Sequence, residues 1–591
     1  MSSPARRFFA LLGAIWIGLA TARAETDWVE ASNTEAQRFI DVLGEFQPEG
    51  LSGFGIPGYD DRISDMTPGY RERYRHALTI LRETYRQRLD QVEDPFVRED
   101  INILIDSIDE SVDSSLINEQ YLLPWRDASR QIYAGIFSLL NPDTPAEKRG
   151  YAIARLKRYL GLDGATAPFL ALFRADYEAA QVDPSRLPPF ADNVTQAIAN
   201  TPRFLAGIRE LLGADDFDPV EVRQLLATLE TQLTTHTIWI RENVLPSART
   251  DFRVPAPVYA DNLRGFGLDI SPEQLISRAQ TAYAEIRNEM RSLAILVAQE
   301  RGWTETDYPT VIRKLKREQL PADEIIPFYQ DIISQIEEII RRERIVTLPD
   351  RPMAIRLASE AENAAQPAPH MSPPPLMGGT GEERGTFVLT SGTPPVDGET
   401  AATFDDFTFA AGTWTLTAHE GRPGHELQFA AMVERGVSIT RSYFAFNSVN
   451  VEGWALYAEA ELKPYEPLAG QLIALQHRLL RASRAFLDPM LNLGLLTPDQ
   501  ARRILSEDVV LSDAMVKQEV DRYTFRMPGQ ATAYFYGYIQ LMAIRADTEI
   551  VLGDKFNRQA FNDFIIAQGL LPAKLLAAAV RNDFISSQTN D

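Results

Sequence analysis

The sequence predicts a mainly α-helical protein with one small β element. Apolar residues recur at spacings of three and four through most of the 591 residues, which is the period of an amphipathic helix. Asp218 and Ser271, both of types that favour helix starts, each precede a proline and a run with this period. Residues 345–395 instead combine strand-like runs with many Pro and Gly residues, so we expect the β element there.

The first 24 residues have the layout of a secretory signal. Arg6 and Arg7 precede an apolar run over residues 8–20, which is short for a bilayer span, and Ala22-Arg23-Ala24 is a small-x-small cleavage site. An uncleaved anchor is the alternative, but no cysteine follows that could carry a lipid, and no later run reaches ~18 apolar residues. We therefore expect cleavage near Ala24, a periplasmic or secreted protein, and no stable membrane anchor afterwards.

Residues 25–245 are expected to form an N-terminal helical domain. Residues 48–67 are rich in Gly, Pro and Asp and predict a loop. Catalytic residue types do not gather in this part, so we interpret it as a support or a lid over a cleft. We expect one helix to begin at residues 33–37. Further helices are expected at residues 68–88, 97–116, 145–160 and 219–244.

Residues 246–591 are expected to form a second domain, after an irregular, Pro-containing boundary at residues 246–262. A long helix begins after Ser271, and its apolar residues form a stripe that predicts burial, consisting of Leu275, Ala279, Ala282, Ile286, Met290, Leu293 and Val297. Further helices are expected at residues 305–318, 322–342, 413–435, 447–462, 468–493, 498–506, 512–526, 530–552, 557–568 and 572–584.

The small sheet is expected within about residues 345–395. Residues 352–358 and 384–390 have strand character, and the Pro-rich residues 364–381 between them predict a loop. We interpret residues 384–390 as a strand that borders the active-site cleft, where it can pair with an extended peptide. A local hairpin without a functional role is the alternative.

Charge and composition exclude several kinds of function. The formal net charge is 59 − 82 = −23 without a dense basic patch, so neither nucleic acid nor an anionic membrane surface is an expected partner. The chain has no cysteine, which excludes disulfides, thiolate nucleophiles and cysteine-type zinc sites. A metal site in this chain must therefore use His, Asp or Glu side chains.

Two of the six histidines, His419 and His425, stand close together around Glu420. Zinc in catalytic sites usually binds three protein ligands and one water, and histidines four positions apart share one helix face. A separation of six positions on a regular helix would instead turn the two imidazoles ~120° apart. Pro423 and Gly424 favour a break in the helix, and two looped-out residues would return His425 to the ligand position. We therefore expect an HExxH motif with an insertion.

The third metal ligand is expected from residues 450–459. Glu452 and Glu459 are seven positions apart and so share nearly the same helix face. We assign Glu452 as the ligand and Glu459 to an outer position, where it orients a ligand histidine. Solvated surface carboxylates are the alternative, which the neighbouring Trp454 and Tyr457 weaken.

A hydrolase also needs a general base and a donor for the oxyanion. Glu420, next to the first ligand histidine, is the expected base toward the attacking water. Tyr534, in the tyrosine-rich residues 528–538, is the expected oxyanion donor, and Arg522 is a candidate for binding a substrate carboxylate. The alternative for Tyr534 is a place in the core, as for most aromatic stripes.

Four segments carry a family resemblance: HEGRPGHELQ at residues 419–428, EGWALYAE at 452–459, PGQATAYFYG at 528–537 and FNDFIIAQGLLPAKLL at 561–576. With them the chain resembles the family catalogued as domain of unknown function 885, and it is similar to the gluzincin-like zinc metallopeptidases. The resemblance implies a helical zincin-like fold, with His419, His425 and Glu452 as zinc ligands and Glu420 as the base. Many relatives have a second His directly after the PGH. Glu426 stands there in this chain, which implies a changed outer shell or a changed charge toward the substrate.

Three functions are compatible with these residues. The first is an exported zinc peptidase that acts on short peptides in a closed helical cleft. The second is a zinc hydrolase of a non-peptide amide or ester, with the same metal site and a different pocket. The third is a catalytically inactive peptide-binding protein, which the complete set of chemical groups disfavours.

Overall fold

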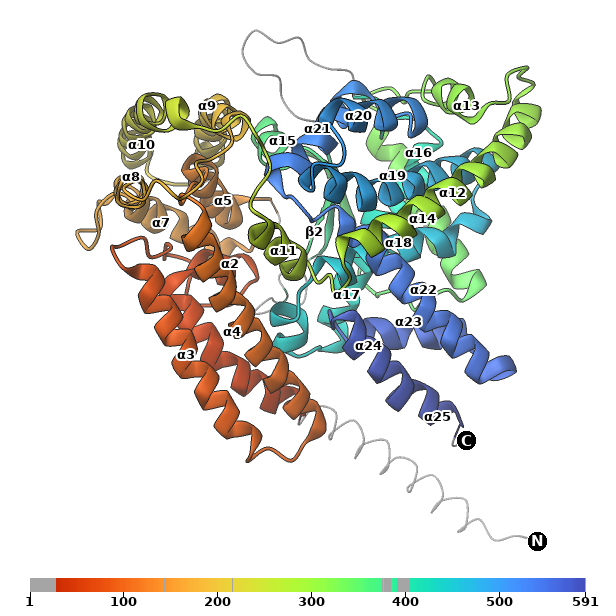
Figure 1. Cartoon of the computed structure of the whole chain (residues 1–591), viewed down its shortest axis with the longest axis horizontal. Helices are drawn as coiled ribbons and strands as arrows, with labels where there is room; N and C mark the ends of the chain where they lie inside the picture. Colours follow the sequence, from red (N-terminus) through yellow and green to blue (C-terminus); the bar gives the residue numbers. More distant parts are fainter. Residues whose placement is uncertain are drawn as a thin grey trace.

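The computed structural model describes residues 28–142, 144–214, 216–374, 376, 384–390 and 404–589. Within these residues the protein is mainly helical with a small three-stranded sheet, as predicted (Figure 1). The predicted export signal, residues 1–24, lies outside the described residues. None of the described helices has both the length and the apolar character needed to cross a membrane.

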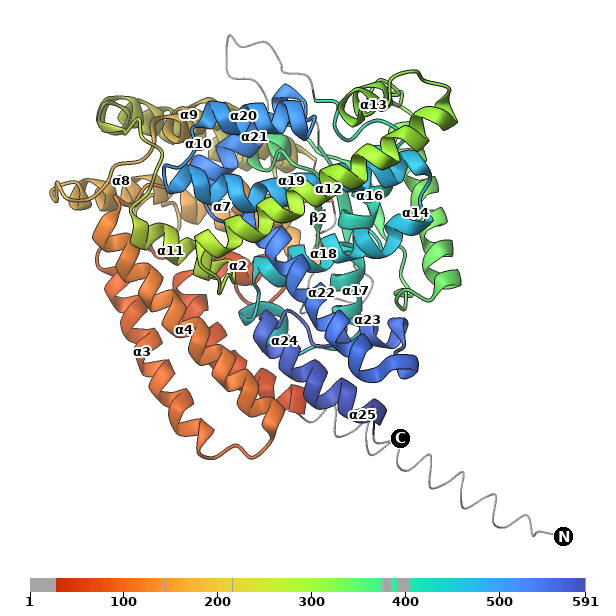
Figure 2. The same cartoon turned by 45° about the vertical axis from the view of Figure 1, so that its right-hand side comes forward.

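The N-terminal half lies on one side of the molecule in both cartoon views (Figures 1 and 2). Its first group of helices packs around a core that includes Leu78, Tyr85 and Ile101. This group comprises residues 28–46, α2 (Pro48–Gly53), α3 (Tyr70–Leu89) and α4 (Pro95–Tyr121). The second group comprises α5 (Ala128–Leu140), α6 (Ala146–Arg149), α7 (Tyr151–Tyr159), α8 (Phe169–Ala180), α9 (Ala191–Gly213), α10 (Pro219–Trp239), η1 (Ile240–Val244) and η2 (Leu245–Ser247). As predicted, Asp218 caps α10, because its side chain accepts a hydrogen bond from the backbone N–H of Val220 at 2.9 Å.

The C-terminal half begins at α11 and contains the sheet. Its helices before and around the sheet are α11 (Ala256–Gly265), α12 (Pro272–Arg301), α13 (Tyr308–Leu315), α14 (Ile325–Glu343) and α15 (Glu360–Ala365). The later ones are α16 (Gly412–Glu420), α17 (His425–Arg435), η3 (Thr440–Phe444), α18 (Ser448–Leu462), η4 (Lys463–Tyr465), α19 (Leu468–Asn492), α20 (Pro498–Arg503), η5 (Ile504–Asp508), α21 (Asp513–Asp521), η6 (Arg522–Arg526), α22 (Thr532–Leu552), η7 (Gly553–Lys555), α23 (Arg558–Ala567), α24 (Ala573–Ala579), η8 (Val580–Ile585) and α25 (Ser586–Thr589).

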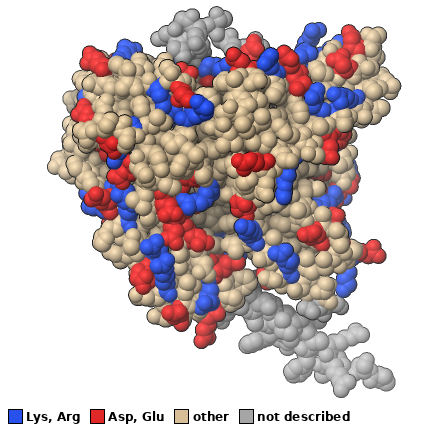
Figure 3. All heavy atoms as spheres, in the orientation of Figure 1, with Lys and Arg blue, Asp and Glu red and all other residues tan. Residues whose placement is uncertain are grey.

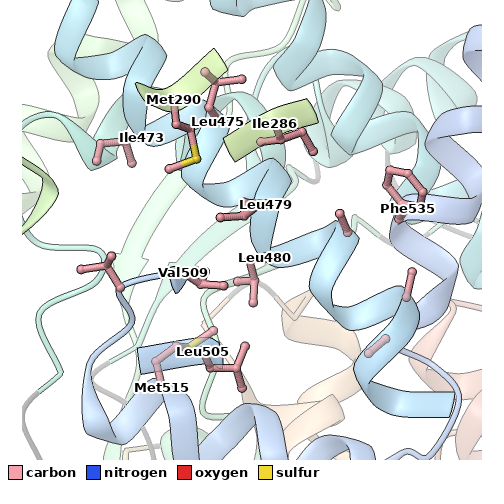
Figure 4. Packing of buried hydrophobic residues seen from close by; sticks show 14 of the residues in the cluster. Ile286, Met290, Ile473, Leu475, Leu479, Leu480, Leu505, Val509, Met515 and Phe535 are labelled. Atoms are coloured by element: carbon pink, nitrogen blue, oxygen red, sulfur yellow. The ribbon is translucent and has the colours of Figure 1, made fainter. Parts of the chain in front are cut away.

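One core of the C-terminal half lies between α12 and α19. Ser271 caps α12 as predicted, and six of the seven residues in the predicted stripe are buried, with Ala282 half-buried. Figure 4 shows Ile286 and Met290 of α12 beside Leu475 of α19. Packing of this stripe fixes α19, which carries Arg481 and Arg484 next to the candidate site.

Two glycines let α18 and α22 approach closely. A Cβ atom on Gly537 would lie 1.9 Å from the carbonyl oxygen of Val449, and one on Gly453 would lie 2.6 Å from the backbone of Gly537. Since no side chain fits in this contact, the two helix backbones touch. The contact holds Glu452 of α18 and Tyr534 of α22 in one rigid unit.

The sheet has the order β1-β3-β2, with β1 (Ala354–Leu357), β2 (His370–Ser372) and β3 (Thr386–Leu389). The strands predicted at residues 352–358 and 384–390 are confirmed as β1 and β3, but the loop predicted at 364–381 contains β2. The predicted role of 384–390 also needs correction: β3 pairs with β1 on one side and β2 on the other and is fully buried, so it cannot pair with a peptide. Strand β2 takes the edge position instead.

Three other segments differ from prediction. Residues 33–37 do not open a helix but lie inside one over residues 28–46, and residues 48–67 begin with α2 rather than a loop. Helix α11 begins inside the predicted irregular boundary at residues 246–262 and continues past it to Gly265. In α2 and α11 a proline occupies the first helical turn, where it needs no N–H partner, and Leu51 and Tyr259 are buried. The prolines that indicated loops therefore start helices.

The two halves are joined by a buried polar cluster at Asp100 of α4. Its carboxylate accepts hydrogen bonds from the hydroxyls of Ser32 at 2.5 Å and Ser438 at 2.7 Å, and from Nε of Arg441 at 2.8 Å. Ile439 packs into the core of α3 and α4. The N-terminal helices are therefore anchored to the half that carries the candidate site.

Candidate metal centre

The chain breaks between the two predicted ligand histidines, as expected from Pro423 and Gly424. Helix α16 ends at Glu420, a turn covers residues 421–424, and α17 begins at His425. A Cβ atom on Gly424 would lie 2.0 Å from the carbonyl oxygen of His419, so only glycine fits there. The indole N–H of Trp454 donates to the carbonyl oxygen of Pro423 at 3.0 Å and fixes the turn.

The break brings His419 and His425, which are buried, together with the half-buried Glu452 in one cluster. Oε2 of Glu452 lies 3.5 Å from Nε2 of His419 and 3.4 Å from Nε2 of His425. The three potential ligand atoms all lie within 4.8 Å of one another. The two imidazole rings are nearly perpendicular, with centroids 4.8 Å apart.

Glu459 sets the orientation of His419. Its Oε1 lies 2.7 Å from Nδ1 of His419, and its Oε2 accepts a hydrogen bond from Thr415 at 2.8 Å. Because the carboxylate can only accept, Nδ1 carries the proton and Nε2 presents a lone pair toward Glu452. Burial raises the pKa of Glu459, but the nearby Arg481 and His419 outweigh it and hold that pKa at about 2, so the group is ionised.

The cluster has the chemistry of a cation site. Oε1 of Glu452 is 3.4 Å from Nε2 of Gln530, whereas Oε2 is buried and receives no hydrogen bond from any described residue. A carboxylate oxygen and imidazole lone pairs that face each other in a buried space repel unless a cation or a proton lies between them. Two nitrogens and one oxygen are a ligand set that zinc accepts, so these residues fit a zinc ion.

Glu420 lies beside the cluster with its side chain at the cavity. It is only 8% exposed, and burial is the main reason that its pKa rises to about 7, with Glu452 adding to the shift. His425, Arg481 and a hydrogen bond from the backbone of Met371 in β2 act in the opposite direction. A carboxyl group with this pKa exchanges a proton near neutral pH, as a general base must.

Tyr534 and Arg522 also lie at the cavity, next to the cluster. The Tyr534 ring is stacked with that of His419, with centroids 6.1 Å apart and planes at 13°. Its hydroxyl accepts a hydrogen bond from Nη2 of Arg522 at 2.8 Å, and burial raises its pKa. The phenol proton is thus kept and remains available to donate into the cavity.

Glu426 does not lie at the cavity. It is fully buried and pairs with Arg422, which lies 2.7 Å away and also contacts Glu337 at 2.7 Å. The predicted substrate-facing role therefore needs correction, because this carboxylate compensates the charge of Arg422 in the turn between α16 and α17.

The sequence reading missed three polar residues around the cluster, namely Gln530, Arg481 and Arg484. Gln530 contacts Glu452 and accepts a hydrogen bond from Arg522 at 2.5 Å. Arg481 and Arg484 lie on α19 among fully buried neighbours. The sequence does contain an indication of Arg481 and Arg484. Two charged residues three positions apart on the buried side of a helix need charged or polar partners in the protein interior.

A cavity of about 760 Å³ separates the N-terminal half from the cluster. One wall comes from the start of α5 and from α9, and the other from β2, α16, α17, α18, η6 and α22. The edge of β2 lies along this cavity, with His370 and Met371 among the lining residues. On the face in Figure 3, acidic and basic side chains are interspersed over both halves.

Fold and geometry together define an α-helical protein with a buried two-histidine, one-glutamate cluster at a large cavity. The chain belongs to the family of bacterial proteins of unknown function described as DUF885, whose model matches residues 48–580. No curated protein matches the sequence.

Two solved structures share the fold. A candidate lipoprotein from Colwellia psychrerythraea is 18% identical with a TM-score of 0.75, and the match covers 96% of this chain and 99% of that one. A candidate lipoprotein of unknown function from Shewanella oneidensis is 18% identical with a TM-score of 0.70, and the match covers 93% and 99%. At this identity the likeness establishes the arrangement of helices and leaves the activity to be argued from the site.

Proposed function

We propose that this protein is an exported, zinc-dependent metallohydrolase with a zincin-like arrangement of its site, and that it cleaves peptide bonds. The observation that carries the proposal is the convergence of Oε2 of Glu452 with Nε2 of both His419 and His425, at 3.5 and 3.4 Å, beside the large cavity.

His419, His425 and Glu452 would hold the zinc ion, and Glu459 keeps His419 in the required tautomer. When bound, zinc would acidify a water molecule and polarise the substrate carbonyl. Glu420 then accepts the proton of the attacking water and passes it to the leaving amine, a role that its position and raised pKa support. Tyr534 donates its phenol proton in a hydrogen bond to the developing oxyanion.

The edge of β2 favours a peptide over a compact ester or amide. Met371 pairs with Phe387 of β3, and its backbone N–H reaches Glu420 on the cavity side. An extended peptide can therefore lie along β2 with a carbonyl close to Glu420. The volume of about 760 Å³ leaves room for a short peptide.

Export is part of the proposal. The signal-like residues 1–24 predict it, and the description of two structural relatives as candidate lipoproteins supports it. Since this chain has no cysteine that could carry a lipid, we propose release after cleavage near Ala24.

The test is zinc content by mass spectrometry together with digestion of a peptide library. We expect stoichiometric zinc in the parent protein, loss of zinc in His425→Ala, and retained zinc in Glu420→Gln with kcat/KM reduced at least about a hundredfold. Glu338→Gln on α14, an exposed carboxylate, is the matched control and should resemble the parent. A zinc-free parent protein, or Glu420→Gln with full activity, would overturn the proposal.

A further inference from the structure

A second, smaller cavity of about 50 Å³ opens beside the metal cluster. It shares Glu420, Arg522 and Tyr534 with the large cavity, so the two adjoin at the reacting groups. Its far side is formed by Arg481 and Arg484 of α19. A polar-lined space of this size can hold a small polar group.

Three guanidinium groups surround Tyr534 at this small cavity. The central carbons of Arg484, Arg522 and Arg481 lie 4.4, 5.2 and 5.9 Å from the centre of the Tyr534 ring. Arg484 is neutralised by Glu519, with which it makes two hydrogen bonds of 2.8 and 2.6 Å. The other two arginines are less completely paired.

Arg522 directs Nη2 to two neutral acceptors, Gln530 and Tyr534, and its nearest ion-pair distance is 3.8 Å to Glu519. Arg481 contacts Glu459 at 3.3 Å, but His419 already uses the same oxygen at 2.7 Å. Nε of Arg481 is buried and has no hydrogen-bond partner among the described residues. The small cavity therefore borders one buried guanidinium donor that lacks an acceptor among the described residues.

We propose that the small cavity binds a carboxylate of the substrate immediately beside the bond that is cleaved. This proposal rests on the proposed function. It defines the substrates as peptides or amides that carry an acidic group next to the cleaved bond. A planar carboxylate matches the planar guanidinium and gives the buried Nε of Arg481 an acceptor. The carboxylate is either the C-terminal one or that of an Asp or Glu side chain.

Two matched substrate pairs distinguish these sources. In the first, a short cleaved peptide is compared with its C-terminal amide, and in the second, a Glu after the cleaved bond is replaced by Gln. We expect kcat/KM to fall at least about tenfold within one pair, because the neutral group leaves buried donors unsatisfied. Equal kcat/KM values within both pairs would overturn the proposal.

Arg481→Lys tests whether the cavity causes this preference. Lysine keeps a charge beside Glu459 but lacks the second donor of the fork. We expect the ratio of acid to neutral kcat/KM to fall severalfold, over and above any loss that the two substrates share. An equal loss for both substrates would indicate a structural role for Arg481 and contradict the subsite.

Binding to the metal-free protein separates this inference from the proposed function. Succinate should bind more tightly than succinamide by calorimetry, and Arg481→Lys should remove the difference. Succinate binding without any peptide cleavage would support the subsite and contradict the hydrolase, whereas cleavage without either preference would support the hydrolase and contradict the subsite.

Discussion

The two walls of the large cavity hold their polar side chains in different ways. On the C-terminal wall, His419 and Glu452 are connected by short contacts to Glu459 and Gln530, and all lie on packed helices or next to them. On the N-terminal wall, Arg126 is exposed just before α5 and Arg130 is exposed on it.

This difference indicates that the two walls have different roles. Reacting groups must be held within a fraction of an ångström, which requires packed elements and a complete set of surrounding hydrogen bonds. The opposite wall has only to limit the size and charge of what enters, and exposed side chains suffice for that. Changes on the C-terminal wall should therefore have large effects, and changes on the N-terminal wall small ones.

The largest expected effect is on the packing that builds the C-terminal wall. In Gly537→Ala the added methyl group would lie 1.9 Å from the carbonyl oxygen of Val449, and the obstacle is backbone that cannot rotate away. We expect a loss of about 3 kcal/mol in the free energy of unfolding, measured by denaturant titration, together with weaker zinc binding.

Gly213→Ala at the end of α9 is the matched control, since a Cβ atom there meets nothing within 4 Å. It should be neutral or slightly stabilising because alanine favours helices. Similar losses in both variants would mean that the close contact between α18 and α22 is not what holds the wall.

The stability of the metal-free protein should depend on pH through Glu420. Burial raises its pKa to about 7 in the folded protein from an ordinary 4.5, so the unfolded chain releases this proton first. The contribution of Glu420 to the free energy of unfolding is fully present below pH 4.5. It is lost as pH rises through 7, and the loss is at most roughly 3 kcal/mol.

Metal-free Glu420→Gln should therefore be more stable than the metal-free parent at pH 8, with little difference at pH 4.5, in thermal unfolding followed by circular dichroism. Glu338→Gln, on the surface, should show no such pH-dependent difference from the parent. If the difference in unfolding temperature between Glu420→Gln and the parent were the same at both pH values, Glu420 would not be a buried carboxyl group with a raised pKa.

Replacing Glu459, which orients the proposed ligand His419, should have a smaller effect than the Gly537 and Glu420 substitutions. Glu459→Gln keeps the shape at Nδ1 of His419 but removes the charge that fixes its tautomer. We expect zinc affinity, measured by competition with a chelator, to fall about 10–100-fold. Affinity equal to the parent would show that the negative charge of Glu459 is not needed to orient His419.

The sequence indicated the helices and the cluster because their signals are local. The break at Pro423-Gly424 and the shared face of Glu452 and Glu459 follow from backbone preferences and helix periodicity. The buried partner of Glu426 and the edge position of β2 did not follow, because both depend on which distant residues pack against them.

The cavity itself also could not be derived from the sequence, since one wall comes from residues more than 200 positions before the cluster. Arg126 and Arg130 stand in an ordinary helical sequence without a motif. Their place opposite η6 emerges only when the cluster at Asp100 joins the two halves.

The smallest effect is expected on the N-terminal wall. Arg130 is exposed, and its charge lies close enough to Arg526 across the cavity to add to the effect of burial in lowering the pKa of Arg526. An acidic group entering the cavity would be attracted by both arginines, but solvent screens such a contact to ~1 kcal/mol or less. Arg130→Gln should therefore raise KM for acidic peptides a few-fold and leave kcat and the zinc content unchanged.

The control is Arg223→Gln, at an exposed position on α10 away from the cavity lining. A large fall in kcat on replacing Arg130 would mean that the N-terminal wall takes part in positioning the reacting groups, and the division between the two walls would no longer hold.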